Sequence, residues 1–199
     1  MKAIGLIGNS GAGKTTLLER LIAHFVQAGL RVAAIKHAHH GFDIDRPGKD
    51  SYRYRSAGAA QVLVASDERW ALLGSEPALP QTPVPGADAP DSDAALAAEA
   101  LAQRRQLERH LARLDPCDLV LVEGFRSQGT IACIEVRRVL PDGSAAPQRA
   151  PVPGMIAVAA DAPTAAQLRL QPGAPVVLDL DDVTSIALFI AAHLEITLC

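Results

Sequence analysis

The chain is poor in cysteine, carries little net charge and has no long apolar run. Its three cysteines, at positions 117, 133 and 199, form no Cys-x-x-Cys pair, which argues against a disulfide framework or a zinc site and for reduced thiols. A formal net charge of −3 gives no sign of the excess of basic residues that is typical of general nucleic-acid binding. No run reaches the roughly 18–20 apolar residues of a membrane-spanning helix, and glycines interrupt residues 1–8 before a signal-peptide core forms. We therefore expect a cytoplasmic protein that neither crosses a membrane nor binds nucleic acid.

Lysine is also scarce, although the chain is long enough for a substantial core. A length of 199 residues with a 49% apolar composition predicts one domain that folds without disulfide or metal staples. Of the 19 basic residues, only Lys2, Lys14, Lys36 and Lys49 are lysines. This sparing use raises the question of what each lysine does.

The first 36 residues have the pattern of a strand, a helix and a second strand. A short apolar run at 2–7 predicts a buried strand, and residues 15–28 have an apolar helical face that ends before Gly29. Residues 30–36 contain β-branched residues and predict a second strand. Such a unit implies parallel strands joined by a right-handed crossover.

The rest of the chain continues the alternation of strands and helices. Residues 37–50 predict a loop, and five prolines at 75–92 predict a flexible insertion in a single domain of residues 1–199. The other predicted elements are a short helix at 51–57, a hairpin of strands at 61–66 and 69–73, a helix at 93–114, strands at 119–122, 131–140 and 155–160, and a last helix from Asp181 or Asp182 to 194. The pattern at 131–140 is that of a half-exposed strand. Together these elements predict an α/β fold with a mainly parallel sheet, helices on both faces and an antiparallel hairpin extension.

The strongest motif lies between the first predicted strand and the first predicted helix. Residues 8–15 read GNSGAGKT, which matches the P-loop pattern G-x-x-x-x-G-K-[ST], and Thr16 follows. The predicted phosphate-binding residues are Gly8, Asn9, Ser10, Gly11, Ala12, Gly13, Lys14, Thr15 and Thr16. Small residues let backbone N–H groups surround a phosphate, and the helix N-terminus adds its dipole. Lys14 is expected to neutralise the β- and γ-phosphates during catalysis, and Thr15 to bind Mg²⁺. The fold is therefore predicted to be the three-layer fold of P-loop NTPases. The alternative is an ordinary glycine-rich turn.

A P-loop also needs a carboxylate near the metal, at the end of a neighbouring strand. Asp118 begins the strand predicted at 119–122 and so lies at the wrong end of the sheet, whereas Glu123 closes it at the ligand end. Glu123 is the predicted metal-binding or water-orienting catalytic residue. Gly124 is predicted to offer a backbone N–H to the γ-phosphate. The alternative is an ordinary exposed carboxylate at a strand end.

Asp161 ends another predicted strand and is a candidate reader of the nucleotide base. A carboxylate accepts paired hydrogen bonds from the N1–H and 2-amino groups of guanine, which adenine lacks. The alternative for Asp161 is a helix or turn cap before Pro163. The Asn-Lys-x-Asp element that usually accompanies guanine recognition is absent.

The loop that follows the second predicted strand gathers histidines and cations. His37, His39 and His40 with two aspartates suggest either a transition-metal site or a polar loop that faces substrate or phosphate, and the second is preferred. Lys36, at the strand end, is predicted to neutralise phosphate. Nearby cations suggest a second anionic ligand or a catalytic arginine, with a solvated basic face as the alternative; they are Arg46, Lys49, Arg53 and Arg55.

Three stretches resemble the molybdopterin-guanine dinucleotide biosynthesis protein B (MobB) family. They are GLIGNSGAGKTTLLERLI, IKHAHHGFDIDRPGKDSYRYRSAGA and DPCDLVLVEGFR. The first stretch occurs in many P-loop proteins, whereas the second and third together are more specific. The family's P-loop maps onto residues 8–16, its strand-end glutamate onto Glu123, its histidine-rich loop onto 36–45 and its D-S-Y-R segment onto 50–53. Residues 75–92 are an insertion relative to the usual pattern.

The resemblance implies a GTP-binding protein that uses Mg²⁺, hydrolyses GTP weakly and forms homodimers. It implies an adapter that assists a partner guanylyltransferase, MobA, in attaching GMP to molybdopterin. The strand at 131–140 is a candidate for strand exchange in such a dimer. The chain shows no obvious glutamine or arginine finger, which predicts slow hydrolysis and an accessory role rather than fast catalysis.

Two other functions on the same fold remain open. A small-molecule kinase would need a lid, and the segment at 75–92 lacks the basic residues expected of one. A metallochaperone-type GTPase would use His37, His39 and His40. The preference for GTP over ATP depends on Asp161 and on the resemblance.

Overall fold

The structure is a computed structural model, and its described residues fall into two compact units. It describes residues 1–37, 45–67, 69–74, 93–125, 129–139, 152–170 and 173–198, with the backbone alone for 93–96. The first unit comprises Met1–His37 and Val84–Cys199, and the second comprises Ala38–Pro83. The proline-rich segment predicted at 75–92 lies outside the described residues, and the assignment of residues 1–199 to one domain stays a prediction. Among the described helices, none has both the length and the apolar character needed to cross a membrane.

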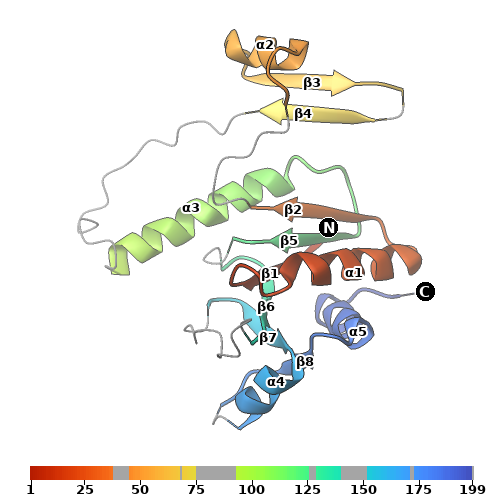
Figure 1. The fold of residues 1–199 in the computed structure, drawn as a ribbon, viewed down its shortest axis with the longest axis vertical. Helices are drawn as coiled ribbons and strands as arrows, with labels where there is room; N and C mark the ends of the chain where they lie inside the picture. Colours follow the sequence, from red (N-terminus) through yellow and green to blue (C-terminus); the bar gives the residue numbers. More distant parts are fainter. Residues whose placement is uncertain are drawn as a thin grey trace. The chain divides into compact units, whose positions relative to one another are not determined.

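A six-stranded sheet forms the centre of the first unit (Figure 1). Its order is β2-β5-β1-β6-β7-β8, and every neighbouring pair is parallel. The strands are β1 (Lys2–Gly8), β2 (Val32–Lys36), β5 (Leu119–Glu123), β6 (Ala132–Arg137), β7 (Met155–Ala160) and β8 (Val177–Asp179). Because β1 lies between β5 and β6, the loop at its carboxyl end opens next to the ends of both neighbours.

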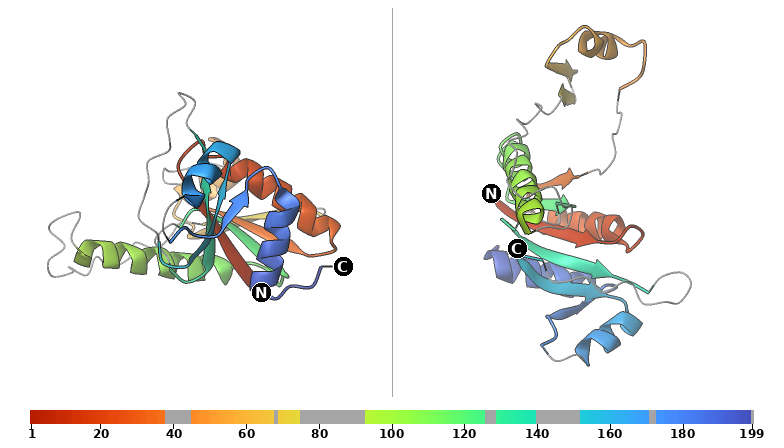
Figure 2. Two further views of the ribbon diagram at one scale, coloured as in Figure 1. Left: turned by 90° about the horizontal axis from the view of Figure 1, so that it is seen from below. Right: turned by 90° about the vertical axis from the view of Figure 1, so that its left-hand side faces the viewer.

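Helices cover both faces of this sheet, as predicted. The helices are α1 (Lys14–Gln27), α3 (Asp93–Leu111), α4 (Ala162–Arg169) and α5 (Val183–Leu194). α1 and α5 pack side by side on one face (Figure 2). α3 and α4 cover different parts of the opposite face. The result is the predicted three-layer α/β arrangement.

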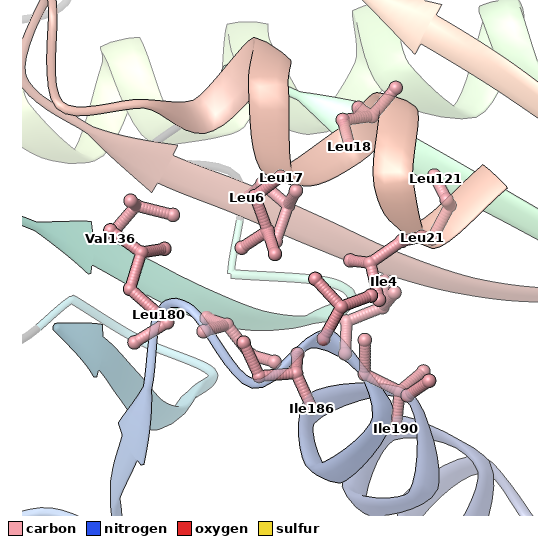
Figure 3. Packing of buried hydrophobic residues seen from close by; sticks show 14 of the residues in the cluster. Ile4, Leu6, Leu17, Leu18, Leu21, Leu121, Val136, Leu180, Ile186 and Ile190 are labelled. Carbon is pink, nitrogen blue, oxygen red and sulfur yellow. The ribbon is translucent and has the colours of Figure 1, made fainter. Parts of the chain in front are cut away.

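The larger part of the core lies between the sheet and the helix pair α1 and α5. Figure 3 shows how alternate strand residues interdigitate with these helices, because successive side chains of a strand point to opposite faces. Leu6 of β1 belongs to the same buried cluster as Leu17 and Leu21 of α1, and all three are almost completely buried. This packing fixes α1, and with it the loop that precedes the helix, against the central strand.

The interpretation of residues 131–140 as a half-exposed strand is wrong. β6 is paired on both edges, with β1 and with β7, and its central residues are buried. The polar residues that suggested exposure are Glu135 and Arg137, whose side chains form an ion pair with a 2.7 Å N–O distance and are only 6% and 11% exposed. A buried strand tolerates such charges when they are paired. Both edges of β6 are paired within the chain, and an exchange of this strand between subunits stays a prediction.

The sequence also missed two elements of the first unit. Residues 162–169 form α4, which begins with Pro163 in its first turn and is capped by Asp161. The short strand β8 adds three residues to the sheet edge. Neither segment has a strong apolar periodicity, since one is short and alanine-rich and the other is only three residues long.

The described part of the second unit is a helix and a hairpin. α2 (Asp50–Ser56) packs against the antiparallel pair β3 (Gln61–Ala65) and β4 (Trp70–Gly74). Val62 and Leu73 are partners across the hairpin, and each is 8% exposed. The predicted hairpin extension is thereby confirmed.

Candidate functional site

The P-loop joins the end of β1 to the start of α1, at the carboxyl edge of the sheet. Gly8 ends β1 with a φ of +144°, and a Cβ on this residue would overlap the carbonyl oxygen of Val136 in β6. Glycine is therefore required where the chain leaves the sheet. The helix then begins after Gly13, whose φ is +95°. The chain turns at Gly8 and at Gly13, and these turns direct the N-terminus of α1 toward the P-loop.

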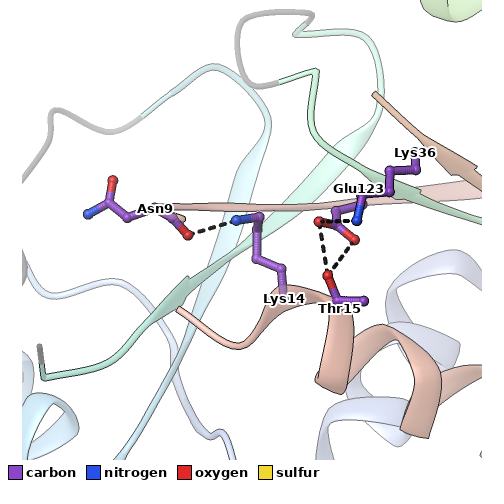
Figure 4. Close-up of polar contacts among 5 residues, drawn as sticks. All are labelled: Asn9, Lys14, Thr15, Lys36 and Glu123. Carbon is purple, nitrogen blue, oxygen red and sulfur yellow. Dashed lines mark hydrogen bonds and ion pairs between the residues drawn. The ribbon is translucent and has the colours of Figure 1, made fainter. Parts of the chain in front are cut away.

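The Lys14 side chain reaches back to the beginning of the P-loop. Its Nζ donates a hydrogen bond of 2.7 Å to the carbonyl oxygen of Asn9, five residues earlier (Figure 4). Burial lowers the pKa of the Lys14 ammonium below its ordinary value; Glu123 opposes this shift and Lys36 adds to it. An anion bound in the loop would favour the charged form of this lysine, because opposite charges at short range stabilise each other.

Glu123 is the residue that links the P-loop to the neighbouring strands. Thr15 Oγ1 donates to both carboxylate oxygens of Glu123, at 3.2 and 3.1 Å, and Lys36 Nζ lies 3.6 Å from one of them (Figure 4). The Glu123 side chain is 11% exposed, whereas that of Lys36 is 64% exposed. The structure therefore brings together the catalytic and metal-binding residues that the sequence proposed, from α1, β5 and β2.

The donor set suits a hard divalent cation. A hydroxyl and a carboxylate are oxygen ligands of the kind that Mg²⁺ takes in nucleotide sites, where phosphates and water complete the shell. Thr15 and Glu123 would hold the ion, and in the structure they bond to each other. Among the described residues, no group of three histidine, cysteine or acidic side chains gathers as an all-protein metal site.

Gly124 is placed differently from the expectation. Its N–H, predicted to reach the γ-phosphate, donates to the carbonyl oxygen of Leu6 at 3.1 Å and so belongs to the sheet. A phosphate contact by this N–H requires that bond to open, and the role stays a prediction. The next residue, Phe125, was not singled out from the sequence. Its φ of +52° makes it an unusual position in the turn.

Asp118 and Asp161, the two strand-end aspartates considered from the sequence, both accept hydrogen bonds from backbone N–H groups. Asp118 lies at the amino end of β5 and accepts the N–H of Arg31 at 2.7 Å, which confirms that it is remote from the ligand end. Asp161 accepts the N–H of Thr164 at 3.2 Å with one oxygen and that of Val139 at 3.1 Å with the other. It therefore caps α4, and its role as a base reader stays a prediction.

The capping role of Asp161 has a measurable consequence. Burial alone would raise the pKa of its carboxyl, but hydrogen bonds from Thr164 and from the Val139 N–H lower it below its ordinary value. Asp161→Ala is expected to reduce the free energy of unfolding by about 1 kcal/mol at neutral pH, the usual effect of losing an N-cap. A lowered folded-state pKa means that the contribution is complete above the ordinary carboxyl pKa and is lost as the pH falls through the lowered value.

Urea unfolding of wild type and of Asp161→Ala measures the difference in their free energies of unfolding. The stability difference between wild type and Asp161→Ala should shrink between neutral pH and about pH 3, because the carboxyl of the unfolded chain binds a proton there more readily than that of the folded chain. An unchanged difference at the two pH values would contradict the capping interpretation.

The histidine loop lies largely outside the described residues. His39 and His40 belong to the segment 38–44, so the structure does not describe either the metal site or the phosphate-facing loop predicted there. His37 is described, and its ring stacks on Phe125 with 4.3 Å between centroids. The cations singled out from the sequence all lie in the second unit; they are Arg46, Lys49, Arg53 and Arg55. Arg55 pairs with Asp45 at 3.1 Å within that unit, and the proposed role of these cations toward an anionic ligand stays a prediction.

Comparison with known proteins identifies the family. Residues 3–84 match the family model described as molybdopterin guanine dinucleotide synthesis protein B, MobB. The molybdopterin-guanine dinucleotide biosynthesis adapter protein of Escherichia coli is 38% identical over 188 residues, which cover 94% of this chain and 89% of that protein. The chain belongs to the MobB family. The adapter protein of Haemophilus influenzae is 42% identical over 125 residues, which are 63% of this chain and 57% of that relative.

Solved MobB structures share the fold. The crystal structure of Bacillus subtilis MobB superposes with a TM-score of 0.60 at 19% identity and covers 96% of this chain and 97% of that one. At this identity the likeness concerns the fold alone. MobB membership supports a role in molybdenum cofactor biosynthesis.

Proposed function

We propose that this MobB protein binds GTP with Mg²⁺ at the P-loop and serves as an adapter in the attachment of GMP to molybdopterin. One observation carries the proposal: Lys14, Thr15, Glu123 and Lys36 converge at the carboxyl edge of the sheet in a chain of the MobB family. The backbone N–H groups of the P-loop and the N-terminus of α1 would hold the phosphates. When bound, Mg²⁺ would neutralise charge between the β- and γ-phosphates.

The residues of the chain supply positioning and charge rather than a dedicated base. Lys14 and Lys36 bring two cations to the phosphate site, and Glu123 lies between them and the hydroxyl of Thr15. Release of Lys14 from the Asn9 carbonyl would free its ammonium for the phosphates.

Calorimetry of GTP and ATP binding with Mg²⁺, with and without molybdopterin, tests the adapter proposal. Tighter binding of GTP than of ATP, coupled to pterin binding, is the expected result. Phosphoryl transfer from a nucleotide to a metabolite would favour the kinase alternative instead, and stoichiometric Ni²⁺ or Zn²⁺ binding lost on His39→Ala would favour the metallochaperone. Asp161→Asn should lose the preference for GTP if this carboxylate reads the base.

Replacement of Glu123 by glutamine should separate nucleotide binding from the action of the metal. The substitution keeps the size of the side chain but removes the charge that faces Thr15 and Lys36. We expect nucleotide affinity without Mg²⁺ to stay within about threefold, and the gain in affinity on adding Mg²⁺ to fall by about tenfold, with slower hydrolysis. Titrations of GDP in EDTA and in Mg²⁺ measure both quantities. An unaltered Mg²⁺ dependence would show that Glu123 does not serve the metal.

The second unit offers the surface that best supports a homodimer. On one face of the hairpin, Leu63 lies opposite Leu72 and Ala65 opposite Trp70. Leu63, Trp70 and Leu72 are 62%, 61% and 44% exposed, while α2 packs on the hairpin. An isolated two-stranded sheet is marginally stable in water, and an exposed apolar face of this kind is typical of an interface. A second copy of the chain is the occupant we propose.

Leu63→Glu is expected to weaken self-association of the chain. A carboxylate in the centre of the apolar face must be desolvated on association, so the dimer dissociation constant should rise at least tenfold, by about 1.4 kcal/mol or more. Gln61→Glu adds the same charge on the same face at a residue that is already polar, and should have a smaller effect. Analytical ultracentrifugation over a concentration series measures both constants. Equal effects of the two substitutions would place the interface elsewhere.

A further inference from the structure

The chain turns in an unusual way directly after Glu123. Gly124 has a φ of +101° and Phe125 a φ of +52°, so two consecutive residues adopt positive φ. Glycine adopts such values readily, but a side chain with a Cβ disfavours them, and for a bulky aromatic residue they are rare. A position of this kind persists only where the surrounding structure holds it in place.

The turn sends the Phe125 side chain to the opposite face of the sheet from Glu123. In a continued strand, residues 121, 123 and 125 would share one face. Leu121 packs in the core cluster of α1, and Glu123 on that face reaches Thr15. Phe125 instead belongs to the cluster of Leu107, Val120 and Val122 on the α3 side, where it is only 1% exposed. Glu123 is therefore the last side chain of β5 on the P-loop face.

The surrounding contacts fix the turn from two strands and one helix. The N–H of His37 donates to the carbonyl oxygen of Glu123 at 2.8 Å, and the N–H of Gly124 donates to Leu6 at 3.1 Å. The His37 ring stacks on Phe125, at 4.3 Å and with 21° between planes, and the His110 ring of α3 lies 6.0 Å from it. A Cβ on Gly124 would come within 2.8 Å of the His37 Cβ, so the turn and β2 are in close contact.

We propose that Phe125 is a positioning residue for Glu123. Its ring, buried on the far face and stacked on His37, holds the left-handed turn that ends β5 and keeps the Glu123 carboxylate against Thr15. The inference deepens the proposed function, because it rests on Glu123 serving Mg²⁺ at the nucleotide. Without the ring, the packing that favours the left-handed turn over extended backbone is lost, and the carboxylate loses its fixed place.

Hydrogen exchange of the nucleotide-free protein tests the structural part of the inference. In Phe125→Ala, the amides of His37 and Gly124 should exchange at least about tenfold faster than in wild type after correction for global stability, because the turn that they bond is no longer anchored. Leu107→Ala is the matched control. Leu107 is fully buried in the same cluster, but it lies on α3 and makes no bond to the turn. Its loss should leave the corrected exchange of both amides unchanged.

Magnesium titration of a fluorescent GDP complex tests the consequence for the site. Phe125→Ala should weaken Mg²⁺ by about tenfold, the usual effect of disturbing a residue that orients a metal ligand, while GDP affinity in EDTA changes little. Leu107→Ala should keep the wild-type Mg²⁺ constant. Equal shifts in both variants, or no shift in Phe125→Ala, would overturn the inference.

A second variant and the Mg²⁺ dependence of wild type decide the cases in which Phe125→Ala gives no clear result. If Phe125→Ala does not fold, Phe125→Leu, which loses the ring stack but keeps an apolar anchor, should show both changes in weaker form. If wild type binds GDP without any Mg²⁺ dependence, the metal part of the proposed function is wrong. In that case the exchange of His37 and Gly124 alone decides whether Phe125 holds the turn.

Discussion

Lys14→Ala should abolish GTP binding, with at least a hundredfold loss of affinity, about 2.7 kcal/mol or more. Lys14 is the cation that lies within the P-loop, where its Nζ already bonds the carbonyl oxygen of Asn9. Burial disfavours its charge in the free protein, so binding of a triphosphate would relieve that penalty as well as gain the direct attraction. The variant loses both contributions, while the N–H groups of the loop remain.

Calorimetry with Mg²⁺·GTP measures the loss, and Lys2→Ala provides a charge-matched control. Lys2 is exposed at the amino end of β1, the opposite end of the same strand from the P-loop. Its removal changes the net charge of the protein by the same amount but should leave GTP affinity within about twofold, because surface charges at that distance are screened by salt. An unchanged affinity in Lys14→Ala would show that the loop is not a phosphate site.

Gly8→Ala should be the most disruptive change of a single methyl group in the site. The added Cβ would overlap the Val136 carbonyl oxygen, which belongs to the backbone of the adjacent strand and has no flexible end that moves away. We expect the free energy of unfolding to fall by about 2–3 kcal/mol, together with loss of GTP binding, because β1 and β6 must separate where the P-loop begins.

Gly29→Ala separates the overlap from the backbone strain. Gly29 also has a positive φ, of +84°, but a Cβ there meets no atom within 4 Å, and the residue follows the far end of α1. It should cost about 1 kcal/mol of stability from the left-handed backbone alone and leave GTP binding unchanged. Urea unfolding and calorimetry of the two variants make the comparison. A Gly8→Ala protein as stable as Gly29→Ala would mean that the two strands separate easily.

The parts of the site that could be predicted depend on local sequence and on one rule of topology. The P-loop is contiguous, so its spacing shows Lys14 and Thr15 directly. Glu123 is 108 residues from Thr15, but the carboxyl ends of parallel strands share one edge of the sheet, and that rule placed the two together correctly. The same rule correctly placed Asp118 at the opposite edge of the sheet, where its carboxylate accepts the backbone N–H of Arg31.

The predictions from sequence failed for a strand with charged residues that are buried as an ion pair, and for two elements too short to show a periodic pattern. Glu135 and Arg137 made β6 look half-exposed, although their mutual ion pair allows both to lie in the buried interior. β8 has only three residues, and α4 is short, so neither has enough periodicity to be recognised. The Asp161 carboxylate bonds Val139, 22 residues earlier, through a contact that no local pattern indicates.

The α/β class, the βαβ unit, the phosphate loop and the family resemblance could all be predicted before the fold was known, because they depend on apolar periodicity and on a contiguous glycine-rich motif. The fold was needed to show which strands are central, that Lys36 pairs with Glu123, and that the chain reverses face between Glu123 and Phe125. Those features depend on side chains and backbone groups that meet across the sheet from distant parts of the chain. Sequence spacing does not encode such meetings, and packing against two strands and a helix holds Phe125 in a backbone conformation that its own residue type disfavours.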